Sequence, residues 1–362
     1  MNIGILSMQK ILNYGSFLQA LSLKLQFESR GHNVYFIDII EGRHIVISEN
    51  KATPKSYLSK IDKYVLKRIE NYILSKRMSK IHVSDYEKYL ETNKKLPKGE
   101  KFDLVVIGSD EVFNATAPSR WGFSTQLFGK IDNADRIVTY AASCGSTTFE
   151  SAKKYGIVDE LADSMKNLER ISVRDKNTYD FVNKITGHYA EINVDPVFIT
   201  NYDRFIVPIK KRKPYLLVYA YVNRINNEKE ISAIKEYAQK HGLDILSVGT
   251  QQRWCNNNIA ANAFELLSYV KNAECIITDT FHGTVFSIKY NKKFAVLIRE
   301  SNRNKLGGLL SQFDLMSRSV EDPRDMENVL SENIDYSAVN GYVKNEQERS
   351  YRYLDEITNT RV

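Results

Sequence analysis

The sequence predicts two consecutive doubly wound α/β domains that face a shared cleft. Short apolar runs typical of buried strands alternate with segments of helical spacing, in one series before residues 195–214 and in another after them. The stretch between the two series holds prolines and a basic run and has no clear periodicity, as expected of a linker. At 362 residues the chain is long enough for about two domains, each with its own core.

The first series begins at the N-terminus. An apolar run over 2–7 predicts a strand, the spacing over 15–30 predicts a helix, and 33–40 again resembles a strand. Gly31 stands where a helix usually ends. Further strands are predicted over 103–108, 136–142, 170–173 and 192–195. Residues 1–200 are therefore assigned to an N-terminal α/β domain.

A segment without this alternation interrupts the N-terminal domain over 51–101. It is rich in Lys, Tyr, Ile and Leu, and Ile61, Val65, Ile69 and Ile73 have helical spacing. We expect a basic helical insertion. Its apolar stripe indicates packing on the protein itself, and its basic face leaves docking on an anionic membrane surface as the alternative.

The second series predicts a C-terminal α/β domain over 201–339. Its strands are expected over 215–222, 244–248, 275–278 and 294–298, and its helices near 228–241, 264–272 and 304–313. Residues 340–362 are expected to form a last helix that packs back on the first domain. In two such domains the carboxyl ends of the strands face the cleft between them, so polar motifs after the strands are candidate site residues.

Composition narrows the class of protein. The chain is 43% hydrophobic and has no apolar run of the roughly 18 residues that a membrane span needs. The first residues lack the features of a signal peptide, and the three cysteines are too few and too scattered for a disulfide framework or a metal site, so a cytoplasmic protein is expected. The net charge of +7 favours anionic partners, but no nucleic-acid recognition motif is present.

The strongest functional signal is His282. It lies between a predicted strand and a predicted helix, next to Gly283 and among the hydroxyls of Thr280 and Thr284. A single histidine is more often structural. At the start of a helix, however, free N–H groups favour a bound anion, and a titratable imidazole beside an anion site favours a catalytic role.

Polar residues also follow the first two strands at the cleft. Asn13 and Gly15 open the first helix, where they are suited to bind an anion or a sugar hydroxyl or simply to cap the helix. Ser109, Asp110 and Asn114 follow a strongly apolar strand. The carboxylate of Asp110 is suited to accept a proton from a substrate hydroxyl, and a helix N-cap is its alternative role.

Three further positions complete the candidate site. Ser143 lies in a turn of small residues, which suits close approach of the backbone to a ligand or to a neighbouring strand. Arg174 ends a strand, where it is suited to bind a carboxylate or phosphate or to form a structural salt bridge. Arg303 follows the strand after His282 and offers a second cation.

Together and in this order, the motifs resemble those of the polysaccharide pyruvyl transferase family. The resemblance spans most of the chain and excludes only the insertion 51–101. The residues that carry it are Asn13-Tyr14-Gly15, Leu18-Gln19-Ala20, Val106-Ile107-Gly108-Ser109-Asp110, Val112, Asn114, Tyr140-Ala141-Ala142-Ser143, Gly145, Ser172-Val173-Arg174, Val194-Asp195-Pro196, Thr278-Asp279, Phe281-His282-Gly283 and Asn302-Arg303.

The resemblance implies a fold like that of the two-domain GT-B glycosyltransferases. It implies transfer of the enolpyruvyl unit of phosphoenolpyruvate onto two hydroxyls of a sugar, which gives a pyruvate ketal and phosphate. The acceptor would be a precursor of a cell-surface or capsular polysaccharide, often linked to a lipid at the inner face of the membrane. Phosphoenolpyruvate is the donor substrate, and we expect neither a cofactor nor a required metal.

In this interpretation His282 is the general acid and Asp110 the base. Arg174, Arg303 and the helix after Gly283 would hold the two anionic groups of the donor. The remaining candidate substrate-binding residues are Asn13, Gly15, Ser109, Asn114, Ser143, Thr280, Phe281 and Thr284.

Three residues depart from the family pattern. Glu111 and Phe113 stand where Gln and Trp are commoner, and Thr280 stands where some branches have Arg, so that Arg303 or Arg299 would have to supply that charge. Three alternatives therefore stay open. They are a nucleotide-sugar glycosyltransferase of the same architecture, a catalytically silent anion-binding scaffold of a glycan-assembly complex, and a membrane-surface protein that acts through its basic insertion.

Overall fold

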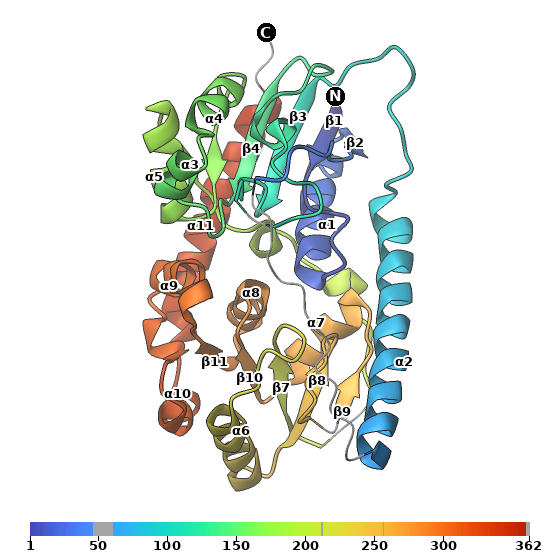
Figure 1. The fold of residues 1–362 in the computed structure, drawn as a ribbon, viewed down its shortest axis with the longest axis vertical. Helices are drawn as coiled ribbons and strands as arrows, with labels where there is room; N and C mark the ends of the chain where they lie inside the picture. The colour runs from blue at the N-terminus through green and yellow to red at the C-terminus, as the bar shows by residue number, and fades with distance from the viewer. Residues whose placement is uncertain (46–60, 117, 211–212, 256, 360–362) are drawn as a thin grey trace.

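A computed structural model describes residues 1–45, 61–116, 118–210, 213–255 and 257–359. The chain forms two α/β domains stacked end to end, each built around a parallel sheet of six strands (Figure 1). The predicted fold class, two doubly wound, Rossmann-like α/β domains, is therefore correct.

The N-terminal sheet has the strand order β2-β1-β3-β4-β5-β6, with every pair parallel. Because helices cover both faces, the central strand β3 is buried at all seven positions, which explains its continuous apolar run. The strands are β1 (Asn2–Leu6), β2 (Asn33–Phe36), β3 (Leu104–Asp110), β4 (Ile137–Ala142), β5 (Ser172–Val173) and β6 (Glu191–Ile192); the helices are α1 (Tyr14–Glu28), α3 (Phe149–Lys154), α4 (Val158–Met165) and α5 (Lys176–Thr186).

The C-terminal sheet has the order β12-β11-β10-β7-β8-β9 and is also parallel. This is the strand order of a doubly wound dinucleotide-binding domain. The strands are β7 (Tyr215–Tyr219), β8 (Asp244–Val248), β9 (Asn257–Ile259), β10 (Cys275–Thr278), β11 (Lys293–Leu297) and β12 (Ser319–Val320); the helices are α6 (Glu228–Lys240), α7 (Ala263–Asn272), α8 (Phe281–Lys289), α9 (Arg303–Gln312) and α10 (Met326–Ser331).

Each sheet has one point at which the strand order reverses. In the first sheet it lies between β1 and β3, and in the second between β7 and β10. Ligands of open α/β sheets bind in the crevice that forms there, beyond the carboxyl ends of the strands. The motifs that follow these four strands therefore meet at the interface between the domains.

The inserted segment contains a long helix, α2 (Ile61–Asp85), which continues as one π-helical turn over Tyr86–Leu90. The first part of the predicted insertion, 51–60, lies outside the described residues. Helix α2 runs beside the second domain with its C-terminal end at the domain interface (Figure 1). There Tyr86 and Leu90 join the core, and Asp85 accepts the N–H of Ala263 on α7 at 3.2 Å. The insertion thus packs on both domains, and not only on the N-terminal domain into which it is inserted.

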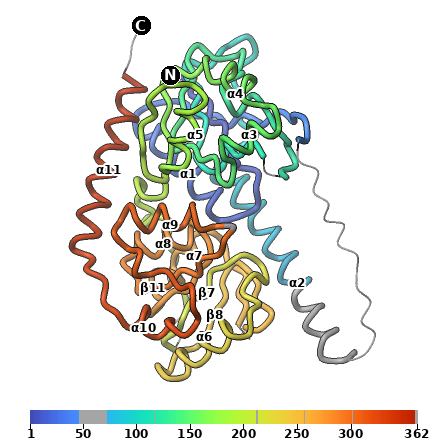
Figure 2. The backbone as a smooth tube through the Cα atoms, turned by 60° about the vertical axis from the view of Figure 1, so that its left-hand side comes forward, coloured from blue at the N-terminus to red at the C-terminus, as the bar shows by residue number. Residues whose placement is uncertain are grey.

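The chain ends in α11 (Tyr336–Asn359), which crosses from the second domain back to the first (Figure 2). Tyr353 Oη donates to the carbonyl of Thr139 in β4 at 2.8 Å, and Arg30 pairs with Asp355. No helix of the described segments is long and apolar enough to cross a membrane.

Candidate active site

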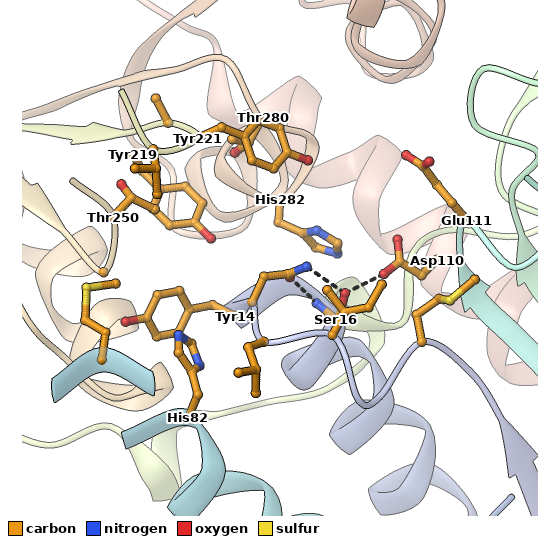
Figure 3. A pocket seen from close by; sticks show the side chains of 18 of the residues that line it. Tyr14, Ser16, His82, Asp110, Glu111, Tyr219, Tyr221, Thr250, Thr280 and His282 are labelled. Atoms are coloured by element: carbon orange, nitrogen blue, oxygen red, sulfur yellow. Dashed lines mark hydrogen bonds between the residues drawn. The ribbon is translucent and has the colours of Figure 1, made fainter. Parts of the chain in front are cut away.

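A cavity of about 670 Å³ opens between the two domains. Its walls come from the turns after β1, β3, β7, β8 and β10, from α2, and from Lys305 on α9. Both points of strand-order reversal therefore border this interdomain cavity, which makes it the candidate active site. Figure 3 shows His282 and Asp110 at one end of it, and Tyr14 and His82 at the other.

His282 is held at the start of α8. The hydroxyl of Thr280 caps this helix by accepting the N–H of Gly283 at 2.9 Å. The imidazole Nε2 lies 3.5 Å from the Oδ2 of Asp195, which comes from the first domain. Burial disfavours the charged form of Asp195, but the charges of His282 and Arg174 lower its pKa below the ordinary value. Asp195 is therefore an anion at neutral pH, and its carboxylate is close enough to orient the imidazole.

Gly15 makes room for this imidazole. A Cβ atom at Gly15 would lie 2.0 Å from Nδ1 of His282, far inside contact distance. The helix start therefore approaches the ring more closely than any other residue would permit. The sequence singled out Gly15 as a ligand contact, whereas its position in the structure fits the packing of His282.

Gly15→Ala should displace His282 and reduce turnover by at least about tenfold, because overpacking of a buried contact typically costs about 1–3 kcal/mol. Steady-state activity and thermal unfolding would measure the effect. Gly341→Ala is the matched control, since nothing lies within 4 Å of its added Cβ. Normal activity of Gly15→Ala would contradict the packing argument.

Asp110 faces His282 from the first domain, at the end of β3. Ser16 donates its hydroxyl to Asp110 Oδ2 at 2.6 Å, and Asn13 in turn donates its Nδ2–H to Ser16 Oγ at 2.9 Å (Figure 3). Asp110 has φ +75°, a left-handed conformation that is strained for a residue with a side chain. No helix follows it, so the alternative role as a helix N-cap does not apply.

Lys305 is a cation of the site that sequence reasoning missed. Its amine lies 2.6 Å from Oε1 of Glu111, which links α9 of the second domain to the end of β3 in the first. Asn114 donates its Nδ2–H to the other oxygen of Glu111 at 2.7 Å. The charge of Lys305, which outweighs desolvation, lowers the pKa of Glu111 to about 2. The site therefore contains an ionised pair that connects the domains.

This pair should make stability depend on pH. Because the folded pKa of Glu111 is about 2 and its ordinary value is 4.5, its contribution should be full above about pH 5 and disappear as pH falls toward 2. Glu111→Gln should accordingly be less stable than the unmodified protein at pH 7, with a difference that shrinks in acid. Urea unfolding at several pH values would measure it; a difference that stays constant would argue against the pair.

Arg174 is buried in the domain interface. Its Nη1 donates to Asp195 Oδ2 at 2.9 Å, while Nε and Nη2 have no hydrogen-bond partner among the described residues. The guanidinium stacks over the ring of Phe281 at 4.0 Å. Arg174 and Phe281 border a neighbouring cavity of about 410 Å³, here called the side cavity, which shares Lys305 with the interdomain cavity. Both the salt bridge and the anion-binding potential foreseen for Arg174 are thus present.

The sequence was also compared with known proteins. The sequence model of polysaccharide pyruvyl transferases matches residues 13–301. The chain belongs to the polysaccharide pyruvyl transferase family. His282, Asp110 and Arg174 lie within the matched region, whereas Lys305 lies beyond it. Among curated proteins, nothing matches the chain significantly.

Several solved structures are similar in overall fold. Staphylococcus aureus MnaA with UDP has a TM-score of 0.49 at 12% identity, over 99% of this chain and 97% of that one. Spinosyn rhamnosyltransferase SpnG with spinosyn aglycone has a TM-score of 0.47 at 10% identity, and Streptomyces sp. SF2575 glycosyltransferase SsfS6 with thymidine diphosphate has 0.47 at 12%. For each of these two the coverage is 99% of this chain and 100% of the other.

Some branches of the pyruvyl transferase family have Arg where this chain has Thr280, and Arg303 or Arg299 was expected to supply that charge. Neither side chain borders the interdomain cavity or the side cavity. Arg303 is exposed and pairs with Glu321 at 2.6 Å, and it borders neither cavity. Successive residues of a helix are rotated by about 100°, so Lys305 points about 200° away from Arg303, into the site. Arg299 is bound to Glu230 at 3.0 Å. Lys305 therefore takes the place that the sequence gave to Arg303.

Several other predicted contact residues hold the backbone of the site in place. The N–H of Gly283 is bound to Thr280, so it is not free to bind an anion. Thr284 donates to the carbonyl of Thr280, and Ser143 donates to Asp175, the N-cap of α5. Gly283, Thr284 and Ser143, like the buried Ser109, do not border the interdomain cavity. Asn13, Asn114 and Thr280 do.

Other chemistry has little support in the described part of the chain. No group of three or more His, Cys, Asp or Glu side chains there is arranged to hold a metal ion. Burial raises the pKa of the Cys144 thiol to about 12, which leaves it unreactive at neutral pH. The ionisable side chains that border the interdomain cavity, among the described residues, are two imidazoles, two carboxylates, one amine and three phenols.

Proposed function

We propose that this protein transfers the enolpyruvyl unit of phosphoenolpyruvate to two hydroxyls of a sugar, forming a pyruvate ketal and releasing phosphate. The observation that carries the proposal is the convergence of His282 and Asp110 on the first turn of α1. His282 packs on Gly15, and the adjacent Ser16 binds Asp110. An acid and a base from opposite domains thus border one end of one cavity.

The cations suit the donor. Phosphoenolpyruvate carries a carboxylate and a phosphate, and the Lys305 amine and the unpartnered Nε and Nη2 of Arg174 are placed to bind them. Lys305 already holds Glu111, so the donor must share this amine with Glu111 or displace it. The departure of the chain from the family pattern at Glu111 is then part of how the donor site is formed.

The residues then act in sequence. His282 protonates the methylene carbon of the donor, and the central carbon takes on oxocarbenium character. The first sugar hydroxyl adds to this carbon as Asp110 accepts its proton. Phosphate leaves, the second hydroxyl adds to the same carbon, and the ketal is complete. Asp110 passes the first hydroxyl proton to the departing phosphate, and the second hydroxyl proton returns to His282, so both residues are restored and the reaction is balanced.

The acceptor is proposed to be a lipid-linked precursor of a cell-surface or capsular polysaccharide, modified at the cytoplasmic face of the membrane. Two features support an acceptor with an apolar part. Leu12 and Val222 border the cavity, and their side chains are 49% and 60% exposed. The net charge of +7 also favours the approach of anionic lipid carriers.

The test is release of phosphate from phosphoenolpyruvate in the presence of galactose- and N-acetylmannosamine-terminated glycosides, with mass detection of the product. Acceptor-dependent release with the mass gain of one pyruvyl ketal is expected. If phosphoenolpyruvate neither reacts nor stabilises the protein against heat, while a nucleotide diphosphate does stabilise it, the function is instead that of a nucleotide-sugar glycosyltransferase. Stabilisation by phosphoenolpyruvate without turnover for any acceptor would favour a silent anion-binding role.

A further inference from the structure

The end of the interdomain cavity away from His282 is walled by the inserted helix α2. Ser75, Met78, Ser79 and His82 border the cavity, and their spacing of three, four and seven residues places them on one face of the helix. The opposite wall comes from the turns after β7 and β8, which include Tyr219 and Thr250 (Figure 3). A segment outside the motifs of the family resemblance thus completes the cavity.

This end of the cavity differs in charge from the other. Asp110, Glu111 and Lys305 border the end near His282. Around α2 the polar groups are neutral hydroxyls and amides, among aromatic rings. The side chains concerned are Tyr14, Ser75, Ser79, Tyr219, Thr250 and Gln251. Aromatic faces combined with neutral donors and acceptors suit a sugar ring better than an anion.

Several polar groups here are unpartnered. Thr250 Oγ1 and Gln251 Nε2 are buried atoms with no hydrogen-bond partner among the described residues. His82 is 5% exposed, and burial lowers its pKa to about 4, so its ring is neutral at pH 7 with one donor and one acceptor nitrogen. Buried polar groups without partners cost free energy, and a bound ligand with hydroxyls would satisfy them.

The two ends are joined by adjacent residues at the start of α1. Tyr14 packs against His82 with ring centroids 4.3 Å apart, and Gly15 packs against His282. Tyr14 is itself fixed by donating to the carbonyl of Ala261 at 2.6 Å. A saccharide bound at α2 that extends along Tyr14 toward Gly15 would therefore reach the acid and base with its hydroxyls.

We infer that α2 forms the acceptor subsite, in which a neutral saccharide ring binds between the Ser75–Ser79–His82 face and the turns after β7 and β8. The inference rests on the proposed function and adds to it the element that selects the acceptor. Acceptor choice is then a property of the insertion, while the donor is bound by residues of the two α/β domains.

The test uses a bulky side chain placed on either side of α2. Ser79→Trp would fill the subsite, and Ser84→Trp, five residues on along the same helix, is the matched control because Ser84 is exposed and does not border the cavity. Ser79 is also exposed enough to accept tryptophan without unfolding the protein. We expect the acceptor KM to rise at least about tenfold in Ser79→Trp with the phosphoenolpyruvate KM little changed, and both constants to be normal in Ser84→Trp.

The outcomes separate this inference from the proposed function. A normal acceptor KM in Ser79→Trp would overturn the subsite, and an equal rise in both KM values would assign α2 to the donor instead. Saturation-transfer NMR with methyl galactoside and methyl N-acetylmannosaminide tests binding without turnover. Binding lost in Ser79→Trp but kept in Ser84→Trp would support the subsite even if phosphoenolpyruvate proved not to be the donor. Failure of both glycosides to bind the unmodified protein would overturn the inference.

Discussion

Replacing His282 with alanine should abolish turnover and leave the fold intact. General acid catalysis by a positioned side chain typically contributes about 10²–10⁴-fold, and His282 is the one histidine whose ring lies within 3.5 Å of a buried carboxylate, that of Asp195, in the described part of the chain. The loss should appear in kcat, because in the proposed function the anionic groups of the donor are held by Lys305 and Arg174. Phosphate release and thermal unfolding, measured side by side, would show it.

A surface histidine supplies the control for this experiment. His241 pairs with Glu327 on the outside of the second domain and borders neither cavity. His241→Ala should therefore leave kcat and both KM values unchanged. Activity near that of the unmodified protein in His282→Ala would remove the general-acid role and with it the proposed order of steps.

Lys305 should matter for donor binding, and Arg303 should not. Replacing a charged hydrogen-bonding group typically costs about 1.5–3 kcal/mol, so Lys305→Met should raise the phosphoenolpyruvate KM by about 10- to 100-fold. Arg303→Met removes the same charge from the same helix two positions earlier, where the side chain is exposed and paired with Glu321. The phosphoenolpyruvate KM of Arg303→Met should therefore be normal. Initial rates over a range of donor concentrations would compare the two.

One complication is the carboxylate that Lys305→Met leaves behind. Glu111 would then lie in the interface without its partner, and the variant would lose stability for that reason alone. The double substitution Glu111→Gln and Lys305→Met removes both charges and keeps the comparison valid. If the double variant bound donor normally, or if Arg303→Met were the defective one, Lys305 would not be the donor cation.

The sequence predicted the sheets well because their strands are buried on both faces. Strand β3 lies within two residues of the expected bounds, and β8 and β10 match them, whereas the edge strands β9 and β12 were not predicted. The sequence placed His282 before the helix, whereas α8 begins at Phe281 and includes it, since the pattern does not show that Thr280 is the helix cap. The short helices α3 to α5 were not predicted at all.

The site was predictable only where it lies next to strands. His282 and Asp110 come directly after β10 and at the end of β3, so their position follows from the parallel topology. Lys305 was missed because the direction of its side chain depends on its rotational position on α9. The short Asn302-Arg303 motif does not fix which residues of that helix face the cavity. The role of α2 was missed because its packing on α7 joins residues 178 positions apart in the chain.

The path of α11 has a consequence for the modularity of the protein. Tyr336 contacts the carbonyl of Lys292 in the second domain, and the helix then runs for 24 residues, about 36 Å, to cover β4 of the first. The N-terminal α/β unit therefore needs the last segment of the chain to cover its own sheet. A fragment that ends in the linker would lack that cover, so we expect that the first 200 residues alone do not form a self-sufficient folding unit.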